Sequence, residues 1–522
     1  MGFSNRVNAS LAVGARNRIA DVVPYSGICA VCLDGCPGFC EVGKSALRGR
    51  EILYPQPFGE VTAGATKDYP VDYSHLSIQG TCVGAIVIEA DSDEAIFPAV
   101  NVETEFGAEE KVKMKLPIFT GALGSTDIAR INWEHMAVGA AISGITVVVG
   151  ENVCGMDPNS EMKNGRVVKS PELERRVRTF QKWQNGYGEI LVQLNVEDMR
   201  LGVAELAIEL GVKAIELKWG QGAKDIGGEV KLPSLERALQ LDERGYIVLP
   251  QPKDKVVQEA FGRGDFKEFE RHSRLGMVDE DGFYKSVEDL RKLGAKYVTL
   301  KTGAYRLADL ARAMKFAAKI DLLTIDGAGG GTGMSPWRMM NEWGIPTIYL
   351  EAMAYKFAKR LDEQGAFVPD LAIAGGFSLE DHIFKALALG APYVKVVCMG
   401  RATMIPAMVG KNVSRWIEEG KLPRDIAKYG DDPSHIFAGA FKLQSEYGNE
   451  YKNIPLGAIG MYTFCDRISA GLQQLMAGAR KFALEHITRD DIVALTEEAA
   501  KVTGIDYIMD SDKEEIEKIF SS

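Results

Sequence analysis

The sequence lacks the signatures of several common protein classes. Its longest apolar stretch, residues 136–150, is too short to cross a bilayer and includes Ser143 and Thr146. Histidine is scarce, and none of the six is spaced as in an H-x-E or H-E-x-x-H metal motif. A G-x-S-x-G elbow and a Walker sequence are also missing. Nothing therefore favours membrane insertion, hydrolysis or phosphoryl transfer.

The sequence also has fewer basic residues than acidic ones. Lys and Arg number 61 against 72 Asp and Glu, which gives a net charge of −11 at pH 7. Because there is no basic stripe, we expect neither nucleic acid nor an anionic membrane as a partner. The first ten residues contain no secretory apolar region, so we expect a cytoplasmic protein.

Glycine, by contrast, is abundant. The chain has 55 glycines in 522 residues, while 46% of its residues are hydrophobic and 25% are charged. The last two values are typical of an ordered globular protein. Since there is no collagen period, we expect the extra glycines at turns and in ligand-binding loops.

A series of short apolar runs alternates with helical stretches through the middle of the chain. This pattern is typical of βα units that build a parallel sheet. The runs occupy residues 116–123, 145–150, 189–195, 214–219, 297–302, 322–326, 370–375 and 393–399. Eight such units predict an α/β fold, a (β/α)8 TIM barrel. A doubly wound sheet is the alternative.

The sequence changes in texture on either side of these units. We expect an N-terminal region with a cysteine cluster over residues 1–110, the barrel over 111–410, and a helical C-terminal extension over 411–522 that packs on the barrel. In the extension, Ile468, Leu472, Leu475, Met476 and Ala479 fall on one helical face, and an acidic helix is expected near residues 512–520.

The connection between the fourth and fifth runs, residues 220–296, is far longer than an ordinary βα loop. Long insertions at the C-terminal face of a barrel often shape or cover a substrate site. A surface excursion without function is the alternative.

Four of the eight cysteines are crowded near the N-terminus. Cys29, Cys32, Cys36 and Cys40 form the pattern C-x2-C-x3-C-x3-C. Four thiolates at this spacing, with glycines and a proline that let the backbone turn, favour a 4Fe–4S cluster. A structural zinc site and reduced thiols are the alternatives, and Cys82 is close enough in sequence to replace one ligand.

Glycine-rich segments follow the last three predicted strands. They are the run from Asp326 to Pro336, the pair Gly375 and Gly376, and Gly400 beside Arg401. Backbone amides without side chains can converge on an anion, and the loops after strands 7 and 8 of many barrels bind a cofactor phosphate. A tight packing turn is the alternative for the first segment, and a surface salt bridge is the alternative for Arg401.

Two lysines are predicted to reach the barrel mouth. Lys218 alternates with apolar neighbours at the end of the fourth run, and Lys301 lies near the end of the fifth. A lysine beside a flavin would stabilise its anionic reduced form. Alternatively, each lysine neutralises a carboxylate such as Glu216 or Asp326. Glu151 and Asn152 follow the second run and are candidates for substrate or flavin contacts, although Asn152 could equally be a helix cap.

Several of these segments resemble one known family. Residues 216–228 resemble the E-I-K-x-x-Q-G-A-K-P-G-x-G-G segment of the FMN-binding domain of glutamate synthase, residues 329–336 its G-G-T-G-A-S-P, and residues 117–125 its P-F-x-x-G-A-M-S. The resemblance extends over about residues 110–410. It implies FMN as a cofactor. The candidate FMN contacts are Gly121, Ala122, Leu123, Gln221, Lys301, Asp326, Gly330, Gly331, Thr332, Gly375, Gly376, Gly400 and Arg401.

The sequence also departs from that family. We expect no N-terminal glutaminase domain, and the sequence has no cysteine between Ala402 and Cys465, where the family's large enzymes ligate a 3Fe–4S cluster. We expect the N-terminal cysteines to take over that electron relay. Asp326-Gly-Ala-Gly329 replaces the usual Ser-Gly-His-Asp and resembles the shorter, stand-alone members.

The resemblance implies an FMN- and iron–sulfur-dependent oxidoreductase that acts on an amino or imino acid, such as 2-iminoglutarate or glutamate. Lys218 and Lys224 would hold substrate carboxylates, and Gln221 and Glu151 would orient substrate or flavin; these four are the candidate catalytic residues. An electron carrier such as ferredoxin or a reductase subunit is the expected partner, in a homo-oligomer or a larger complex. The alternatives are an N-methylglutamate synthase-like amine oxidoreductase, an electron-transfer subunit, or a barrel that has lost its flavin.

Overall fold

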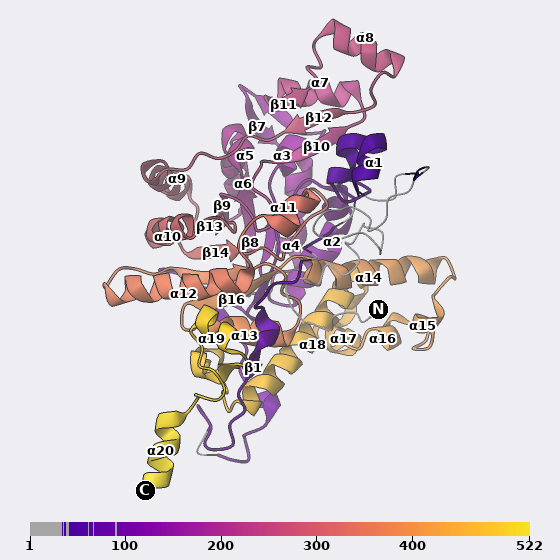
Figure 1. Cartoon of the computed structure of the whole chain (residues 1–522). Coiled ribbons are helices and arrows are strands. Elements are labelled where there is room, and N and C mark those ends of the chain that lie inside the picture. Colours follow the sequence, from indigo (N-terminus) through magenta and orange to yellow (C-terminus); the bar gives the residue numbers. More distant parts are fainter. Residues whose placement is uncertain (1–33, 35, 38–40, 61, 66, 89–90) are drawn as a thin grey trace.

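The structure is a computed structural model that describes residues 34, 36–37, 41–60, 62–65, 67–88 and 91–522. Its centre is a ring of eight parallel strands (Figure 1). In chain order they are β4 (Ile118–Thr120), β5 (Val147–Val149), β8 (Ile190–Leu194), β9 (Ala214–Lys218), β13 (Tyr297–Thr302), β14 (Leu322–Asp326), β15 (Asp370–Ala374) and β16 (Val394–Met399). Each lies within one of the eight predicted runs, so the predicted barrel is confirmed.

The ring follows the order of the sequence. Each strand pairs with the next, from β5 round to β16, and β16 pairs with β4. Isolated bridges from Phe119 to Thr146 and from Leu123 to Val149 join β4 to β5 and close the ring. A doubly wound sheet would have two open edges and a reversal of strand order, so that alternative is excluded.

Helices follow the strands and build the outer layer. They are α2 (Asp127–Ile142), α4 (Pro171–Trp183), α6 (Val203–Glu209), α9 (Glu280–Leu293), α10 (Leu307–Phe316), α12 (Thr347–Glu363), α13 (Glu380–Leu389) and α14 (Arg401–Glu418). Local sequence fixes several of their starts: the side chains of Thr126 and Ser170 accept the backbone N–H groups of Ala129 and Leu173, which caps α2 and α4.

The interior of the ring is filled by apolar side chains. Phe119, Val148, Leu191, Ala214 and Leu322 are buried there. Phe106, Val112 and Met114 belong to the same cluster and come from the hairpin of β2 (Thr104–Phe106) and β3 (Val112–Met114). This hairpin therefore packs against the barrel interior, which is a solid core and not a pore.

The connection from β9 to β13 carries a small sheet of its own. β10 (Glu229–Leu232), β12 (Phe269–His272) and β11 (Ile247–Leu249) form it in that order, all antiparallel. It also contains α7 (Leu235–Glu243) and α8 (Lys255–Arg263), and α8 projects away from the barrel (Figure 1). We call residues 221–279 the insertion.

The N-terminal region lies across one side of the barrel. After α1 (Glu41–Arg48), the Tyr54 hydroxyl donates to Glu229 in the insertion, and the Tyr73 hydroxyl donates to Glu351 on α12. β1 (Leu76–Ile78) pairs with β17 (Ile492–Ala494) near the other end of the chain. The two terminal regions therefore contact each other, and the three-part division of the chain stays a prediction.

The C-terminal region is mostly helical, as predicted. α18 (Leu456–Gly478) packs on α14 and α2. Ile468, Leu472 and Met476 are fully buried and Leu475 partly buried, so the expected apolar face is confirmed. α20 (Lys513–Ser521) is the expected acidic helix and extends away from the body (Figure 1).

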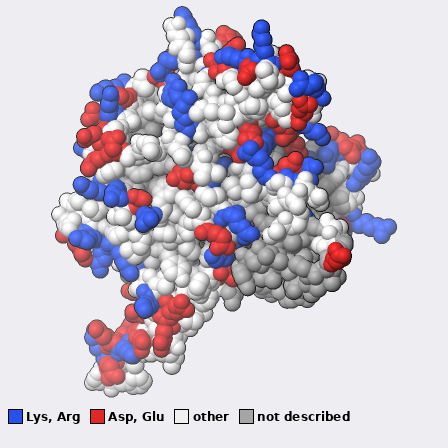
Figure 2. Space-filling model, turned by 45° about the horizontal axis from the view of Figure 1, so that its top comes forward, with Lys and Arg blue, Asp and Glu red and all other residues white. Residues whose placement is uncertain are grey.

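The remaining elements are short or peripheral. They are α3 (Val153–Met156), β6 (Glu161–Lys163), β7 (Arg166–Lys169), α5 (Val196–Leu201), α11 (Trp337–Glu342), α15 (Arg424–Ala427), α16 (Pro433–Ile436), α17 (Ala440–Tyr447) and α19 (Glu497–Thr503). On the face shown in Figure 2, basic and acidic side chains are interspersed. Among the described residues, no helix is both long and apolar enough to cross a membrane.

Candidate active site

The predicted catalytic side chains meet at the carboxyl ends of the strands. The Lys218 ammonium, at the end of β9, lies 2.6 Å from a Glu151 carboxylate oxygen beyond β5 and 3.0 Å from the Gln221 side-chain oxygen. Burial alone would raise the pKa of Glu151, but the ammonium of Lys218 outweighs it and lowers the pKa to about 2. Glu151 is therefore a fixed negative charge at neutral pH.

Lys224 is the second cation of this group. Its ammonium donates to the backbone carbonyl of Met334 at 2.9 Å and so ties the start of the insertion to the loop after β14. Burial and repulsion from Lys218 lower the pKa of Lys224 to about 8. Near neutral pH this lysine can therefore hold an anion and also exchange a proton.

Lys301 and Asp326 form a buried ion pair on neighbouring strands, with 3.0 Å between ammonium and carboxylate. Burial lowers the pKa of Lys301, but Asp326 and the nearby Glu216 carboxylate outweigh it, so the pKa is raised. The alternative considered for Lys301, neutralisation of a carboxylate, is thus present. It leaves the predicted contact with a flavin untested.

The glycines named from the sequence meet along one part of the rim. A Cβ on Gly121 would lie 2.7 Å from the Cα of Gly400, so the ends of β4 and β16 touch. A Cβ on Gly330 would be 3.7 Å from the Cα of Gly375, which has φ +123°. The contact at Gly121 requires the absence of a side chain, and the two contacts bring the end of the first strand to the eighth and the end of the sixth to the seventh.

Gly331 has a different reason for being glycine. A Cβ there would lie 2.1 Å from the carbonyl oxygen of Ala63, in the N-terminal region. The Thr332 hydroxyl accepts the N–H of Met334 within the same loop. The packing turn considered for this segment therefore accounts for Gly331 and Thr332, whereas Gly330 keeps its open side.

Arg401 is a cation without an anion. It begins α14 beside the exposed Gly400, and burial lowers its pKa. Within the described part of the chain, its guanidinium has no hydrogen-bond acceptor and no carboxylate within ion-pair distance. The surface salt bridge considered for it is therefore absent there, and a phosphate at this helix start would fit.

The cysteine prediction cannot be followed in the structure. Cys29, Cys32 and Cys40 lie outside the described residues, while Cys36 and Cys82 are exposed. The described residues contain no group of three or more potential metal ligands. The cluster stays a prediction.

The insertion walls a small cavity at the mouth. We call it the head-group cavity. It has a volume of about 60 Å³, and it is lined by Glu151, Lys218, Gln221 and Lys224 together with residues 273–276 of the insertion. The Arg274 guanidinium holds that segment 2.9 Å from Glu197 on α5. The expectation that the insertion shapes the site therefore agrees with the geometry.

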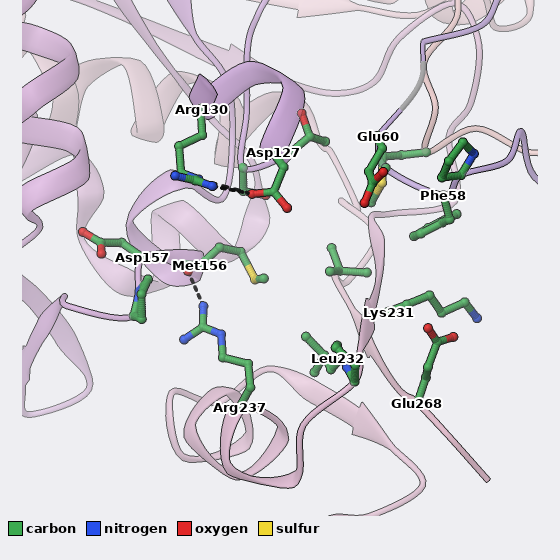
Figure 3. A pocket seen from close by; sticks show the side chains of 18 of the residues that line it. Phe58, Glu60, Asp127, Arg130, Met156, Asp157, Lys231, Leu232, Arg237 and Glu268 are labelled. Carbon is green, nitrogen blue, oxygen red and sulfur yellow. Dashed lines mark hydrogen bonds and ion pairs between the residues drawn. The ribbon is translucent and has the colours of Figure 1, made fainter. Parts of the chain in front are cut away.

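A wider cleft of about 1050 Å³ lies between the insertion, α3 and the start of α2 (Figure 3). Several of its charges are matched within the wall: Arg130 pairs with Asp127 at 3.0 Å, and Arg237 points across to the carbonyl of Met156 (Figure 3). Other charged side chains, among them Glu60, Lys267 and Glu268, also line this cleft.

Two residues that support the site escaped the sequence analysis. Arg176, buried on α4, donates to the carbonyl oxygens of Leu123 at 2.7 Å and Gly124 at 3.0 Å, and so fixes the loop after β4. Asp198 accepts the N–H of Asn152, whose φ is +64°, and burial raises the pKa of Asp198 to about 7. Both lie far in sequence from the loops they hold, and only the capping pattern at Asn195 pointed to Asp198.

The role of Asn152 is now clear. It occupies the position before α3, but its side chain caps no backbone N–H group of that helix. Instead, its side-chain oxygen accepts the Tyr246 hydroxyl of the insertion at 3.2 Å. It therefore helps to join the second strand end to the insertion.

Part of the barrel is similar to known proteins. Residues 272–415, from the end of β12 into α14, match the conserved region in glutamate synthase. The chain is 29% identical over 185 residues to an archaeal glutamate synthase (NADPH) of Archaeoglobus fulgidus, which is 35% of this chain and 32% of that protein. It is 30% identical over 223 residues to an archaeal-type glutamate synthase (NADPH) of Thermotoga maritima. The match covers 41% of this chain and 38% of that protein.

A third relative is the glutamate synthase large subunit-like protein YerD of Bacillus subtilis, 30% identical over 191 residues, 35% of this chain and 32% of that protein. The chain spans about a third of the length of these relatives. A flavocytochrome b2 variant with sulfite bound is similar in structure, with a TM-score of 0.46 and 12% sequence identity. The match covers 85% of this chain and 81% of that one. The TM-score and the identity are too low to support an inference. The resemblance found in the sequence is confirmed for the second half of the barrel, which matches the conserved region in glutamate synthase.

Proposed function

We propose that the chain is an FMN- and iron–sulfur-dependent oxidoreductase that acts on a carbon bearing nitrogen in an amino or imino acid. The observation that carries the proposal is the half-buried Arg401 at a glycine-lined rim, which has no ion-pair partner among the residues that the structure describes. That rim lies within or beside the region that matches glutamate synthase, and two lysines and Glu151 lie at the same mouth.

The residues at the rim fit a phosphorylated flavin. Arg401 and the first N–H groups of α14 would hold the phosphate, and Gly400, where a Cβ would meet no atom within 4 Å, leaves room beside it. Arg176 would keep the loop of Gly121, Ala122 and Leu123 in place, because it holds two carbonyls of that segment. FMN would supply hydride exchange with the substrate carbon.

The charged groups of the head-group cavity would bind the substrate. The Lys218 and Lys224 ammonium groups would pair with a carboxylate, and the Glu151 carboxylate would accept hydrogen bonds from a substrate amine. Because the pKa of Lys224 is about 8, this residue can also give a proton to the substrate near neutral pH. Lys301, paired with Asp326, would place positive charge beside the reduced flavin.

The cysteine quartet would supply the electrons. Cys29, Cys32, Cys36 and Cys40 would ligate a 4Fe–4S cluster that exchanges single electrons with an external carrier, such as ferredoxin or a reductase subunit. The region that follows them contacts the rim, because Ala63 packs against Gly331 of the β14 loop. A relay that starts at these cysteines would therefore lead to the barrel mouth.

Anaerobic purification tests the proposal. We expect about one FMN and about four iron atoms per chain, a yellow-brown colour that dithionite bleaches, and reduction of the flavin by an amino acid or its oxidation by an imino acid. Arg401→Met should lower flavin content and leave iron unchanged. A fully folded, colourless protein that does not take up added FMN would refute the proposal, and a coloured protein without turnover would make it an electron-transfer subunit.

A further inference from the structure

A second cleft adjoins the head-group cavity. It has a volume of about 630 Å³ and lies outside the strand ends of β9, β13 and β14. Trp219, Asp225 and Gly276 line both spaces, so the two spaces share a wall. A ligand whose head group sits against Lys218 can therefore extend past Asp225 into this second space.

Aromatic side chains dominate the walls of the cleft. Trp219, Tyr305, Phe316 and Trp343 line it, and Val278, Ala304 and Ile345 add apolar surface. The Tyr305 and Trp343 rings meet edge to face with centroids 5.7 Å apart, and Trp219 meets Phe316 in the same way at 6.1 Å. We call this space the aromatic cleft. Its walls match a flat apolar group better than a charged one.

The charges at the aromatic cleft do not provide for a second carboxylate arm. Arg312 is paired with Asp309 at 2.7 Å. Asp225, at the junction with the head-group cavity, repels a carboxylate that passes it. The exposed Arg306 is the one guanidinium among the described lining residues without an ion pair, and it stands at the rim before α10. Because it is exposed, water screens its charge, and it would hold a carboxylate arm only weakly.

The head-group cavity limits the size and the charge of the group that can bind beside Lys218. At about 60 Å³ it is roughly a tenth of the volume of the neighbouring cleft, so it admits only a small group. It presents both signs of charge, Lys218 and Lys224 against Glu151. These dimensions suit the amino and carboxylate groups on one carbon, and they leave the side chain of the substrate to the aromatic cleft.

We propose that the substrate is an amino or imino acid with an aromatic side chain, whose head group occupies the head-group cavity and whose ring occupies the aromatic cleft. The inference rests on the proposed function in taking this ligand as the compound that the enzyme oxidises or reduces. It makes Trp343, Trp219 and Tyr305 specificity-determining residues. Glutamate, with its second carboxylate, would be a poor ligand.

Titration calorimetry on the full chain tests the inference, with L-phenylalanine, L-glutamate and glycine as probes and the flavin content of each sample measured. We expect L-phenylalanine to bind about tenfold or more tightly than either other probe, because only its ring fills the cleft. Val278→Trp, at a position that is 46% exposed, fills the cleft without disturbing the core. It should weaken L-phenylalanine about tenfold and leave glycine within about twofold.

Trp343→Ala should have the same effect as Val278→Trp. Phe441→Ala is the matched control, because it removes a 63% exposed aromatic side chain on α17, outside the cleft. Equal or tighter binding of L-glutamate, no binding of L-phenylalanine, or no effect of Val278→Trp would each overturn the inference. If flavin is bound and L-glutamate is preferred, the proposed function stands and the inference fails. If L-phenylalanine binds in the expected way but FMN does not bind, the aromatic cleft does bind the ring of the ligand, and the proposed function fails.

Discussion

Replacing Lys218 with Met gives the sharpest prediction for the site. Methionine keeps the length of the side chain but removes the ammonium that lies 2.6 Å from Glu151. The Glu151 carboxylate is 25% exposed and the Lys218 side chain 11% exposed, so water can replace the lost cation only in part. We therefore expect a destabilised protein in which Glu151 takes up a proton more easily.

The magnitude follows from the pKa of Glu151. Its value of about 2, against an ordinary value of 4.5, is a depression of about 2.5 units. At about 1.4 kcal/mol per unit, the pair stabilises the fold by about 3 kcal/mol at pH 7. Because a depressed carboxyl pKa stabilises only while the group is ionised, this contribution is present above about pH 4.5 and is lost as the pH falls towards 2. The difference between variant and wild type should follow the same course.

Urea unfolding at pH 7, 5 and 3 measures the effect. At pH 7 Lys218→Met should cost about 2–3 kcal/mol, and the deficit should shrink at pH 3. Adding Glu151→Gln should recover part of the loss, because no uncompensated carboxylate then remains. Lys292→Met is the matched control: its side chain is 72% exposed and 3.6 Å from Glu288, so little should change. An unchanged urea midpoint at pH 7, or a deficit that persists at pH 3, would refute the reasoning.

Three further predictions concern other parts of the molecule. Arg176→Met removes the donors to the carbonyls of Leu123 and Gly124, so the affinity for added FMN should fall about tenfold while urea stability drops by only a few kcal/mol; unchanged FMN affinity in a titration would contradict the role. Burial raises the pKa of Glu351, so the fold binds a proton there and loses stability as the pH rises above the ordinary carboxyl range. Glu351→Gln cannot ionise and should therefore lose less stability between pH 5 and pH 8 in urea unfolding; an equal loss would count against it. Cys32→Ala should remove iron, measured by a chelator assay, and leave flavin in place, and full iron content would reject the quartet as ligands.

The barrel could be predicted because its strands are buried on both faces. All six residues of β13 and all five residues of β8 are buried. β8 is apolar except for Gln193, whereas β13 mixes Tyr, Val and Leu with Thr299, Lys301 and Thr302. Helix starts are similarly local: Ser170 before Pro171 is a cap that the sequence displays directly. Order along the chain then gives order around the ring, since sequential βα units pack beside one another.

The contacts within the site could be predicted only in part. The sequence indicated that Lys218 and Glu151 would reach the mouth, because both follow strands, but 67 residues separate them and nothing local specifies their ion pair. Arg176 lies 53 residues from the carbonyl that it holds. The sheet of the insertion was missed because its strands are three or four residues long and pair antiparallel among charged side chains. The aromatic cleft draws its walls from separate segments after β9, β13 and β14, which only the closed ring brings together.

The central claim is that the rim around Arg401 binds a phosphorylated flavin. Titration of FMN and of riboflavin into protein stripped of flavin tests it directly, because the two ligands differ only in the phosphate. We expect FMN to bind about 100-fold or more tightly than riboflavin, and Arg401→Met to remove most of this difference. Equal affinity for the two flavins, or no binding of either, would contradict it.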